Sequence, residues 1–132
     1  MSKVRLTTHV FPKVFSELVL HELDPRYSRA TVSIAADSGA LPFGMVLTRT
    51  ADGAYGPLRE TEGAPGDPHA VLISPVDDAA EIREALVLRG YCIINGGNLV
   101  FDKSVTQKAD VLRALGDRGF IVKEVPGDVH AY

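Results

Sequence analysis

The chain has 132 residues, of which 45% are hydrophobic and 23% are charged, and its formal net charge is −3. This length suits one domain built around one core, and the composition is ordinary for a soluble globular protein. Because the net charge is acidic and the lysines and arginines are scattered, we expect neither a nucleic acid nor a membrane as a partner.

The first 25 residues, MSKVRLTTHVFPKVFSELVLHELDP, differ in character from the rest of the chain. They begin without the apolar core of a secretory signal, which predicts that the protein stays in the cytoplasm in which it is made. Pro12 removes a main-chain donor and favours an edge or extended conformation. Two interpretations stay open: an extended arm that lies on the surface of a partner, or a first strand of the domain's own sheet.

Three of the next segments show strand patterns. In YSRATVSIA, residues 27–35, apolar and polar side chains alternate, which predicts a half-buried strand. A turn with the sequence SGALP then leads into a predicted buried strand over residues 43–47. HAVLISPVD, residues 69–77, predicts another short strand. Between them, residues 50–68 are rich in glycine, proline and acidic residues, which predicts an outward-facing surface loop.

The segment EALVLRGYCIINGGNLVF, residues 84–101, is the densest apolar stretch. Arginine, asparagine and glycine interrupt it, so it is too broken for a membrane-spanning helix of about 20 apolar residues. A period of two predicts one strand with a shared face made of Leu86, Leu88, Gly90, Cys92 and Ile94. Residues 95–98, NGGN, then predict a turn, and residues 99–101 predict a short return strand.

Cys92 is the single cysteine, and this register places it among leucine and isoleucine side chains. In such surroundings a free cysteine acts as a small hydrophobe, and no histidine flanks it as an activating base. The histidines, His9, His21, His69 and His130, have no metal-site spacing. We therefore predict no enzyme, no metal and no cofactor, and expect Cys92→Ala to cost only about 1–2 kcal/mol of core packing.

Residues 104–119, SVTQKADVLRALGDRG, predict the one helix of the domain. Ser104 and Gln107 have the spacing of a capping box, and Ala109, Leu112 and Leu115 recur at helical intervals. The following FIVKEV predicts a last strand. One helix among about six short strands predicts an α+β domain that is mostly β.

Four segments, in this order, resemble the lambda-type bacteriophage head decoration proteins: SGALPFGMVL, AVLISPVD, EALVLRGYCIINGGNLVF and TQKADVLRALGDRGFIV. The resemblance implies a compact β-clip or β-tulip-like domain with one short C-terminal helix. It divides the chain into an extended N-terminal arm over residues 1–25, a β-rich decoration domain over residues 26–125 and a C-terminal tail over residues 126–132.

The resemblance also implies a mechanical function. Such proteins bind as homotrimers to the outer surface of the mature capsid, where they hold neighbouring major capsid protein subunits against the pressure of packed DNA. The protein is then made in the cytoplasm of the bacterial host and ends in the virion. Alternation and exposure indicate six residues of the arm as contacts with the major capsid protein: Val4, Leu6, Val10, Phe11, Val14 and Phe15.

Two other classes of function remain as alternatives. A small β-clip module that binds a ligand or carbohydrate would present an aromatic platform, for which Tyr27, Tyr55, Tyr91 and Tyr132 are available but are not clustered in the sequence. A cysteine-dependent enzyme would lose its activity on Cys92→Ala.

Overall fold

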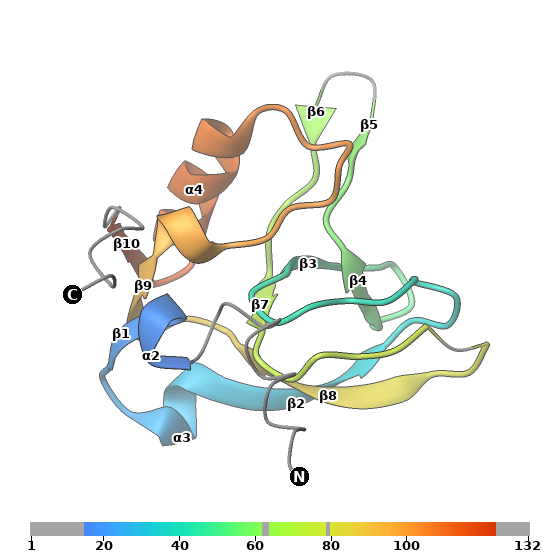
Figure 1. Cartoon of the computed structure of the whole chain (residues 1–132), viewed down its shortest axis with the longest axis horizontal. Helices are drawn as coiled ribbons and strands as arrows, with labels where there is room; N and C mark the ends of the chain where they lie inside the picture. Colours follow the sequence, from blue (N-terminus) through green and yellow to red (C-terminus); the bar gives the residue numbers. More distant parts are fainter. Residues whose placement is uncertain (1–14, 62–63, 79, 124–132) are drawn as a thin grey trace, which may run out of the picture.

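The computed structural model describes residues 15–61, 64–78 and 80–123 (Figure 1). In chain order, its elements are α2 (Phe15–Leu18), β1 (Val19–Glu22), α3 (Pro25–Ser28), β2 (Arg29–Ile34), β3 (Val46–Arg49), β4 (Tyr55–Pro57), β5 (Glu60–Thr61), β6 (Ala64–Pro65), β7 (Ala70–Leu72), β8 (Arg83–Leu88), β9 (Cys92–Asn95), the 3₁₀ helix η2 (Gly96–Asn98), α4 (Lys108–Asp117) and β10 (Phe120–Lys123). The predicted mostly β character is confirmed. The β-clip or β-tulip class stays a prediction.

Five strands form a closed barrel in the order β2-β4-β3-β7-β8. β2 and β8 pair antiparallel from Arg29 opposite Leu88 to Ile34 opposite Arg83. The alternation predicted for residues 27–35 is confirmed, because Ile34 is buried while Thr31 and Ser33 are exposed. Buried side chains of Ile34, Leu47, Leu72, Ala85 and Val87 belong to one core cluster, which these barrel strands share.

The prediction of a surface loop over residues 50–68 is wrong. Tyr55–Pro57 forms β4, which pairs antiparallel with β3 and also pairs parallel with β2 where Tyr55 lies opposite Ile34. β4 therefore closes the barrel, and Ala54, Gly56, Pro57 and Leu58 are buried. A strand that contains glycine and proline shows no alternation of apolar and polar side chains, so the sequence pattern does not predict it. Its burial depends on the strands that pair with it. The strand predicted over residues 43–47 also shifts and begins at Val46.

The single strand predicted over residues 86–94 is two strands in two different sheets. β8 ends at Leu88 and β9 begins at Cys92, and between them Gly90 and Tyr91 have φ values of 137° and 58°. This turn carries the chain from the barrel to a separate sheet, so the shared face from Leu86 to Ile94 does not exist. Side-chain alternation with a period of two cannot detect such a break, because it depends only on the residue types and not on the direction of the backbone.

The return strand predicted over residues 99–101 is also wrong. Residues 96–98, predicted as part of a turn, form η2, and the Asn95 side chain accepts a hydrogen bond from the Gly97 N–H. Val100 then makes only an isolated parallel bridge with Met45. The chain therefore leaves β9 toward the barrel instead of folding back as a hairpin.

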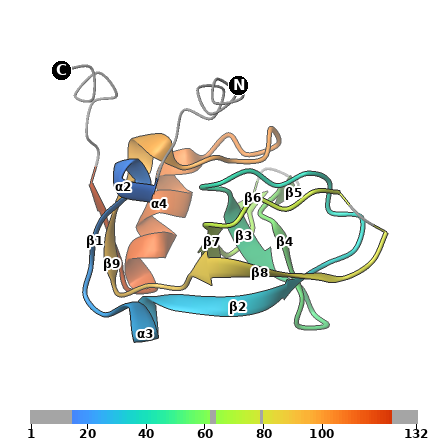
Figure 2. The same cartoon turned by 60° about the horizontal axis from the view of Figure 1, so that its bottom comes forward.

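β9 is the central strand of a three-stranded sheet, with β1 antiparallel on one side and β10 parallel on the other. Figure 2 shows α4 between this sheet and the barrel. The helix residues Val111 and Leu115 are buried in a cluster that contains Ile94 and Phe120 from the sheet and Val46, Val71 and Leu88 from the barrel. This cluster joins the two sheets into one body. Ala109, which we placed on the apolar stripe, is exposed.

The predicted capping box of α4 is replaced by a contact from a distant strand. The Ser104 hydroxyl accepts a hydrogen bond from the Glu60 N–H at 3.1 Å. The Glu60 carboxylate of β5 in turn accepts from the N–H groups of Thr106 at 2.9 Å and Gln107 at 3.2 Å, and from the Thr106 hydroxyl. A carboxylate here satisfies donors at the start of the helix and interacts favourably with its dipole.

The contact between Glu60 and the residues before α4 predicts that the stability of the fold falls at low pH. The hydrogen bonds from Thr106, and then that from Gln107, lower the pKa of Glu60 below its usual value of 4.5. Because the pKa is lower in the folded state, the stabilisation is present above the unfolded value and is lost as the pH falls through the folded one. We expect Glu60→Gln to lower the free energy of unfolding at pH 7, and the gap to wild type to narrow as the pH falls below 4.5. Urea titrations from pH 7 downward measure the gap, with the exposed Glu84→Gln as control. A gap that does not narrow below pH 4.5 contradicts the prediction.

Candidate docking surface

Both ends of the described chain meet at one end of the three-stranded sheet. Val19, at the start of β1, lies opposite Ile94 of β9. Val122 and Lys123, at the end of β10, pair with Ile94 and Asn95. Because β1 and β10 run in opposite directions on either side of β9, the segments before residue 15 and after residue 123 join the domain at the same end of the sheet (Figure 2).

The segment that leads into β1 is anchored firmly to the domain. Leu18 of α2 is fully buried, and the Asn98 side chain donates a hydrogen bond to the Glu17 carbonyl oxygen at 2.8 Å. Phe15 packs against the larger core cluster, and the Arg29 guanidinium carbon lies 4.8 Å from the centre of its ring. Residues 15–18 are therefore packed as part of the domain.

Arg29 is held in place by a charged network that links β1, α3 and β2. The Glu22 carboxylate accepts hydrogen bonds from Arg29 at 2.7 and 2.9 Å and from the Ser28 hydroxyl at 2.6 Å. Its side chain is only 9% exposed. The Arg29 hydrogen bonds lower the pKa of Glu22 against the opposing effect of burial. A bidentate pair of this kind gives a fixed geometry as well as attraction.

The six predicted contact residues now divide into two groups. Phe15 lies in α2 and makes the contacts within the domain described above. Val4, Leu6, Val10, Phe11 and Val14 lie outside the described residues. The arm boundary predicted at residue 25 is corrected, because residues 15–22 form α2 and β1 and residues 25–28 form α3. For residues 19–22 the second interpretation, a first strand of the domain's own sheet, is the right one, because β1 pairs with β9.

The sequence reasoning missed an exposed apolar surface beside this sheet. Six large apolar side chains are exposed among the described residues. All except Ile82 come from the three-stranded sheet, from the turn before β9, or from the connection that runs from β1 through α3 to β2. We define the apolar face by the other five residues: Leu20, Leu23, Tyr27, Tyr91 and Ile121. Tyr91 lies at the strand break next to Gly90, and Leu20 lies at the bulge in β1. Neither feature has a signal in side-chain alternation.

Cys92 is a packing residue, as predicted. It is 1% exposed, and burial, reinforced by the negative charge of Glu22, raises the pKa of its thiol to about 12. Its neighbours in the core cluster are apolar. Within the part of the chain that the structure describes, no three histidine, cysteine, aspartate or glutamate side chains gather as metal ligands.

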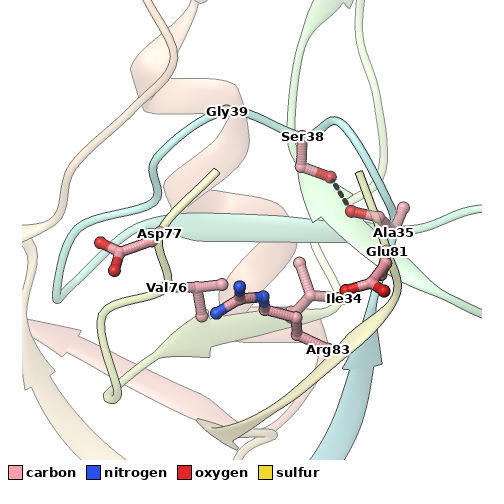
Figure 3. Close-up of a pocket in the computed structure, with 8 residues that line it drawn as sticks. All are labelled: Ile34, Ala35, Ser38, Gly39, Val76, Asp77, Glu81 and Arg83. Carbon is pink, nitrogen blue, oxygen red and sulfur yellow. Dashed lines mark hydrogen bonds between the residues drawn. The ribbon is translucent and has the colours of Figure 1, made fainter. Parts of the chain in front are cut away.

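Two hollows lie on the described part of the surface, and one is small while the other is polar. One lies at an end of the barrel, between Ser38, Asp77, Glu81 and Arg83, and its volume of about 10 Å³ suits a single water (Figure 3). A more open hollow of about 360 Å³ is lined mainly by charged residues: Asp67, Arg89, Asp117 and Arg118, with Pro68 and Ala114. Small-molecule sites are mostly apolar, so neither hollow has the usual lining of one.

The three tyrosines that the structure describes do not form the flat platform that a carbohydrate module requires, and Tyr132 lies outside the described residues. Tyr27 and Tyr91 come together with ring centres 6.4 Å apart, but their planes are inclined by 62°. Tyr55 lies edge-on to His69 instead. None of the helices in residues 15–61, 64–78 and 80–123 is long and apolar enough to cross a membrane.

The fold and the surface together define a class: a small β-barrel domain with an attached sheet from one end of which both terminal segments depart. Comparison with known families then identifies the member. Residues 8–120 match the model of the family described as bacteriophage lambda head decoration protein D, and the chain belongs to this family. It is a family of structural head proteins, as the resemblance implied. No curated protein matches the chain.

Proposed function

We propose that this protein decorates the outside of a mature phage head, where it binds as a homotrimer and stabilises the contacts between major capsid protein subunits against DNA pressure. Membership of the head decoration family supports the capsid role. The observation that carries the docking model is the strand register, which brings both terminal segments to one end of the β1-β9-β10 sheet. That end is the proposed capsid-facing side.

In this proposal, residues 1–14 are the arm. Val4, Leu6 and Val10 alternate with polar residues, a pattern suited to adding a strand to a coat-protein sheet. Strand addition uses main-chain hydrogen bonds and makes few demands on side-chain identity, which fits a segment without a motif. Phe11 and Val14 complete the proposed contacts, and Phe15 holds the base of the arm against the domain.

Three arms on one trimer provide the affinity. A single short segment binds weakly because ordering it costs conformational entropy. Three arms held by one rigid body raise the local concentration, and the gain reaches about 10²–10⁴-fold over a single contact. The trimer therefore binds where three coat subunits present their sites together. The chain is made in the host cytoplasm and then becomes part of the outer virion surface; with a net charge of −3 it contacts neither the genome nor a membrane.

Deletion of residues 2–14 tests the proposal. Phe15 is retained because it packs against the core, so the shortened chain keeps its fold. We expect binding to expanded heads, measured by co-sedimentation, to fall by at least about 100-fold through the loss of three linked contacts. Ile82→Asp, at an exposed residue directly before β8, is the control and leaves binding unchanged. Undiminished binding of the first variant removes the arm from the mechanism.

A further inference from the structure

One guanidinium holds both ends of the segment that connects the N-terminal residues to the domain. This segment, residues 15–22, comprises α2 and β1. At its start, the centre of the Phe15 ring lies 4.8 Å from the guanidinium carbon of Arg29. At its end, the Glu22 carboxylate accepts two hydrogen bonds from the same guanidinium, at 2.7 and 2.9 Å. Arg29 therefore bridges the first and the last residue of the segment.

Arg29 is itself fixed by the barrel. It is the first residue of β2, where it lies opposite Leu88 of β8. The Ser28 hydroxyl gives the Glu22 carboxylate a third hydrogen bond, at 2.6 Å. Because the planar fork of a guanidinium binds a carboxylate in one orientation, Glu22 sets the plane in which Arg29 meets the Phe15 ring.

The helix α2 depends on contacts of this kind because it is only one turn long. A helix of 4 residues makes too few internal hydrogen bonds to be stable by itself. Its last residue, Leu18, is fully buried, and the Glu17 carbonyl oxygen accepts a hydrogen bond from the Asn98 side chain at 2.8 Å. Phe15, its first residue, is only half-buried at the margin of the core cluster. The contact with Arg29 therefore stabilises the end of α2 that lies next to the N-terminal residues.

We infer that Arg29 is a positioning residue, which holds Phe15 in the orientation set by Glu22 and so fixes where the N-terminal residues join the domain. This inference rests on the proposed function, in which residues 1–14 are the arm that binds the coat protein. A fixed base lowers the conformational entropy that each arm loses on docking. Arg29 thereby raises the affinity for heads through the arm and not through a contact of its own.

Arg29→Lys tests this role, because lysine keeps the positive charge and loses the flat fork that meets both the carboxylate and the ring. A cation–π contact at a partly exposed site changes an equilibrium about two- to fivefold. Three arms act together in the trimer, so we expect the dissociation constant for expanded heads to rise about 10- to 100-fold. Co-sedimentation measures this constant, and circular dichroism checks the fold.

Arg26→Lys is the matched control for the chemical change. Arg26 forms the same kind of bidentate pair with Asp24, at 2.9 and 3.2 Å, and its side chain is 83% exposed. The substitution therefore removes the same fork without touching α2 or β1, and we expect wild-type binding to heads.

A spin label next to α2 measures the position of the arm base in the free protein. Cys92, the single native cysteine, is 1% exposed, so the thiol of Lys13→Cys takes a nitroxide label alone. We expect Arg29→Lys to increase the mobile fraction of this label at least about twofold. A label at Lys103→Cys, an exposed residue in the connection that leads to α4, is the control and should not respond. Equal loosening of both labels overturns the inference.

Phe15→Leu gives an independent check. Leucine keeps an apolar side chain against the core cluster but offers no ring to the guanidinium. Since Phe15→Leu and Arg29→Lys remove one and the same interaction, we expect the double variant to bind heads no more weakly than the weaker single variant. Losses that add overturn the inference.

The binding and label measurements separate failure of the inference from failure of the proposed function. If deletion of residues 2–14 weakens binding while Arg29→Lys changes neither binding nor the label at residue 13, the arm stands and the positioning role is overturned. If Arg29→Lys releases that label while neither it nor the deletion weakens binding, the positioning role stands and the proposed function of the arm is contradicted.

Discussion

Gly90→Ala is expected to be among the most destabilising single substitutions in the domain. Gly90 has a φ of 137°, which L side chains rarely adopt, and an added Cβ would lie 2.7 Å from the Arg118 carbonyl oxygen. A strained backbone and an overpacked contact each cost about 1–3 kcal/mol, so we expect a loss of about 2–4 kcal/mol in the free energy of unfolding. Urea unfolding followed by circular dichroism measures it, at a fixed protein concentration because assembly also contributes.

The expected loss of stability is large because Gly90 lies where β8, β9 and the connection between α4 and β10 meet. The turn joins the barrel strand β8 to the sheet strand β9, and the adjacent Tyr91 N–H donates to the Gly119 carbonyl oxygen between α4 and β10 at 2.9 Å. Gly116→Ala is the matched control, since no atom lies within 4 Å of its added Cβ. In the helix, alanine is favoured over glycine by about 0.5–1 kcal/mol, so this variant gains stability. Equal effects at the two glycines contradict the role assigned to Gly90.

Leu115→Ala is expected to cost about 2–5 kcal/mol, as large-to-small substitutions in a core do. Leu115 is fully buried in α4, within the cluster that joins the helix, the sheet and the barrel. Alanine is an excellent helix former, so the loss reports the missing contacts and the cavity and not helix propensity. Thermal and urea unfolding measure the change.

Leu112→Ala on the same helix is the comparison for this prediction. Leu112 is only partly buried at the margin of the cluster, so the same chemical change removes fewer contacts. We expect a clearly smaller loss than at Leu115. Equal losses would mean that α4 does not hold the barrel and the sheet together in the way that the cluster indicates.

The sequence predicted the family of the chain, which the comparison confirms, whereas the contacts of the N-terminal arm stay a prediction. The boundary predicted at residue 25 differs from the structure, in which residues 15–22 form α2 and β1. Residues 15–22 carry an apolar pattern that fits an arm on a partner as well as a strand in the domain's own sheet. Only the pairing of β1 with β9 distinguishes the two, because its partner residues lie 70 to 75 positions apart along the chain.

The sequence pattern by itself determined the features that depend on residues close together in the chain. These are the strand at β2, the apolar segment of α4 that carries Leu112 and Leu115, the last strand at β10 and the packing role of Cys92. The tertiary structure decided what depends on distant contacts. Gly90 divides an apolar run between two sheets, β4 closes the barrel despite its glycine and proline, and Glu60 caps a helix that was expected to cap itself. These features depend on hydrogen bonds between main-chain groups and partners that are distant in the sequence. The type of a residue does not indicate which distant residue will be its partner.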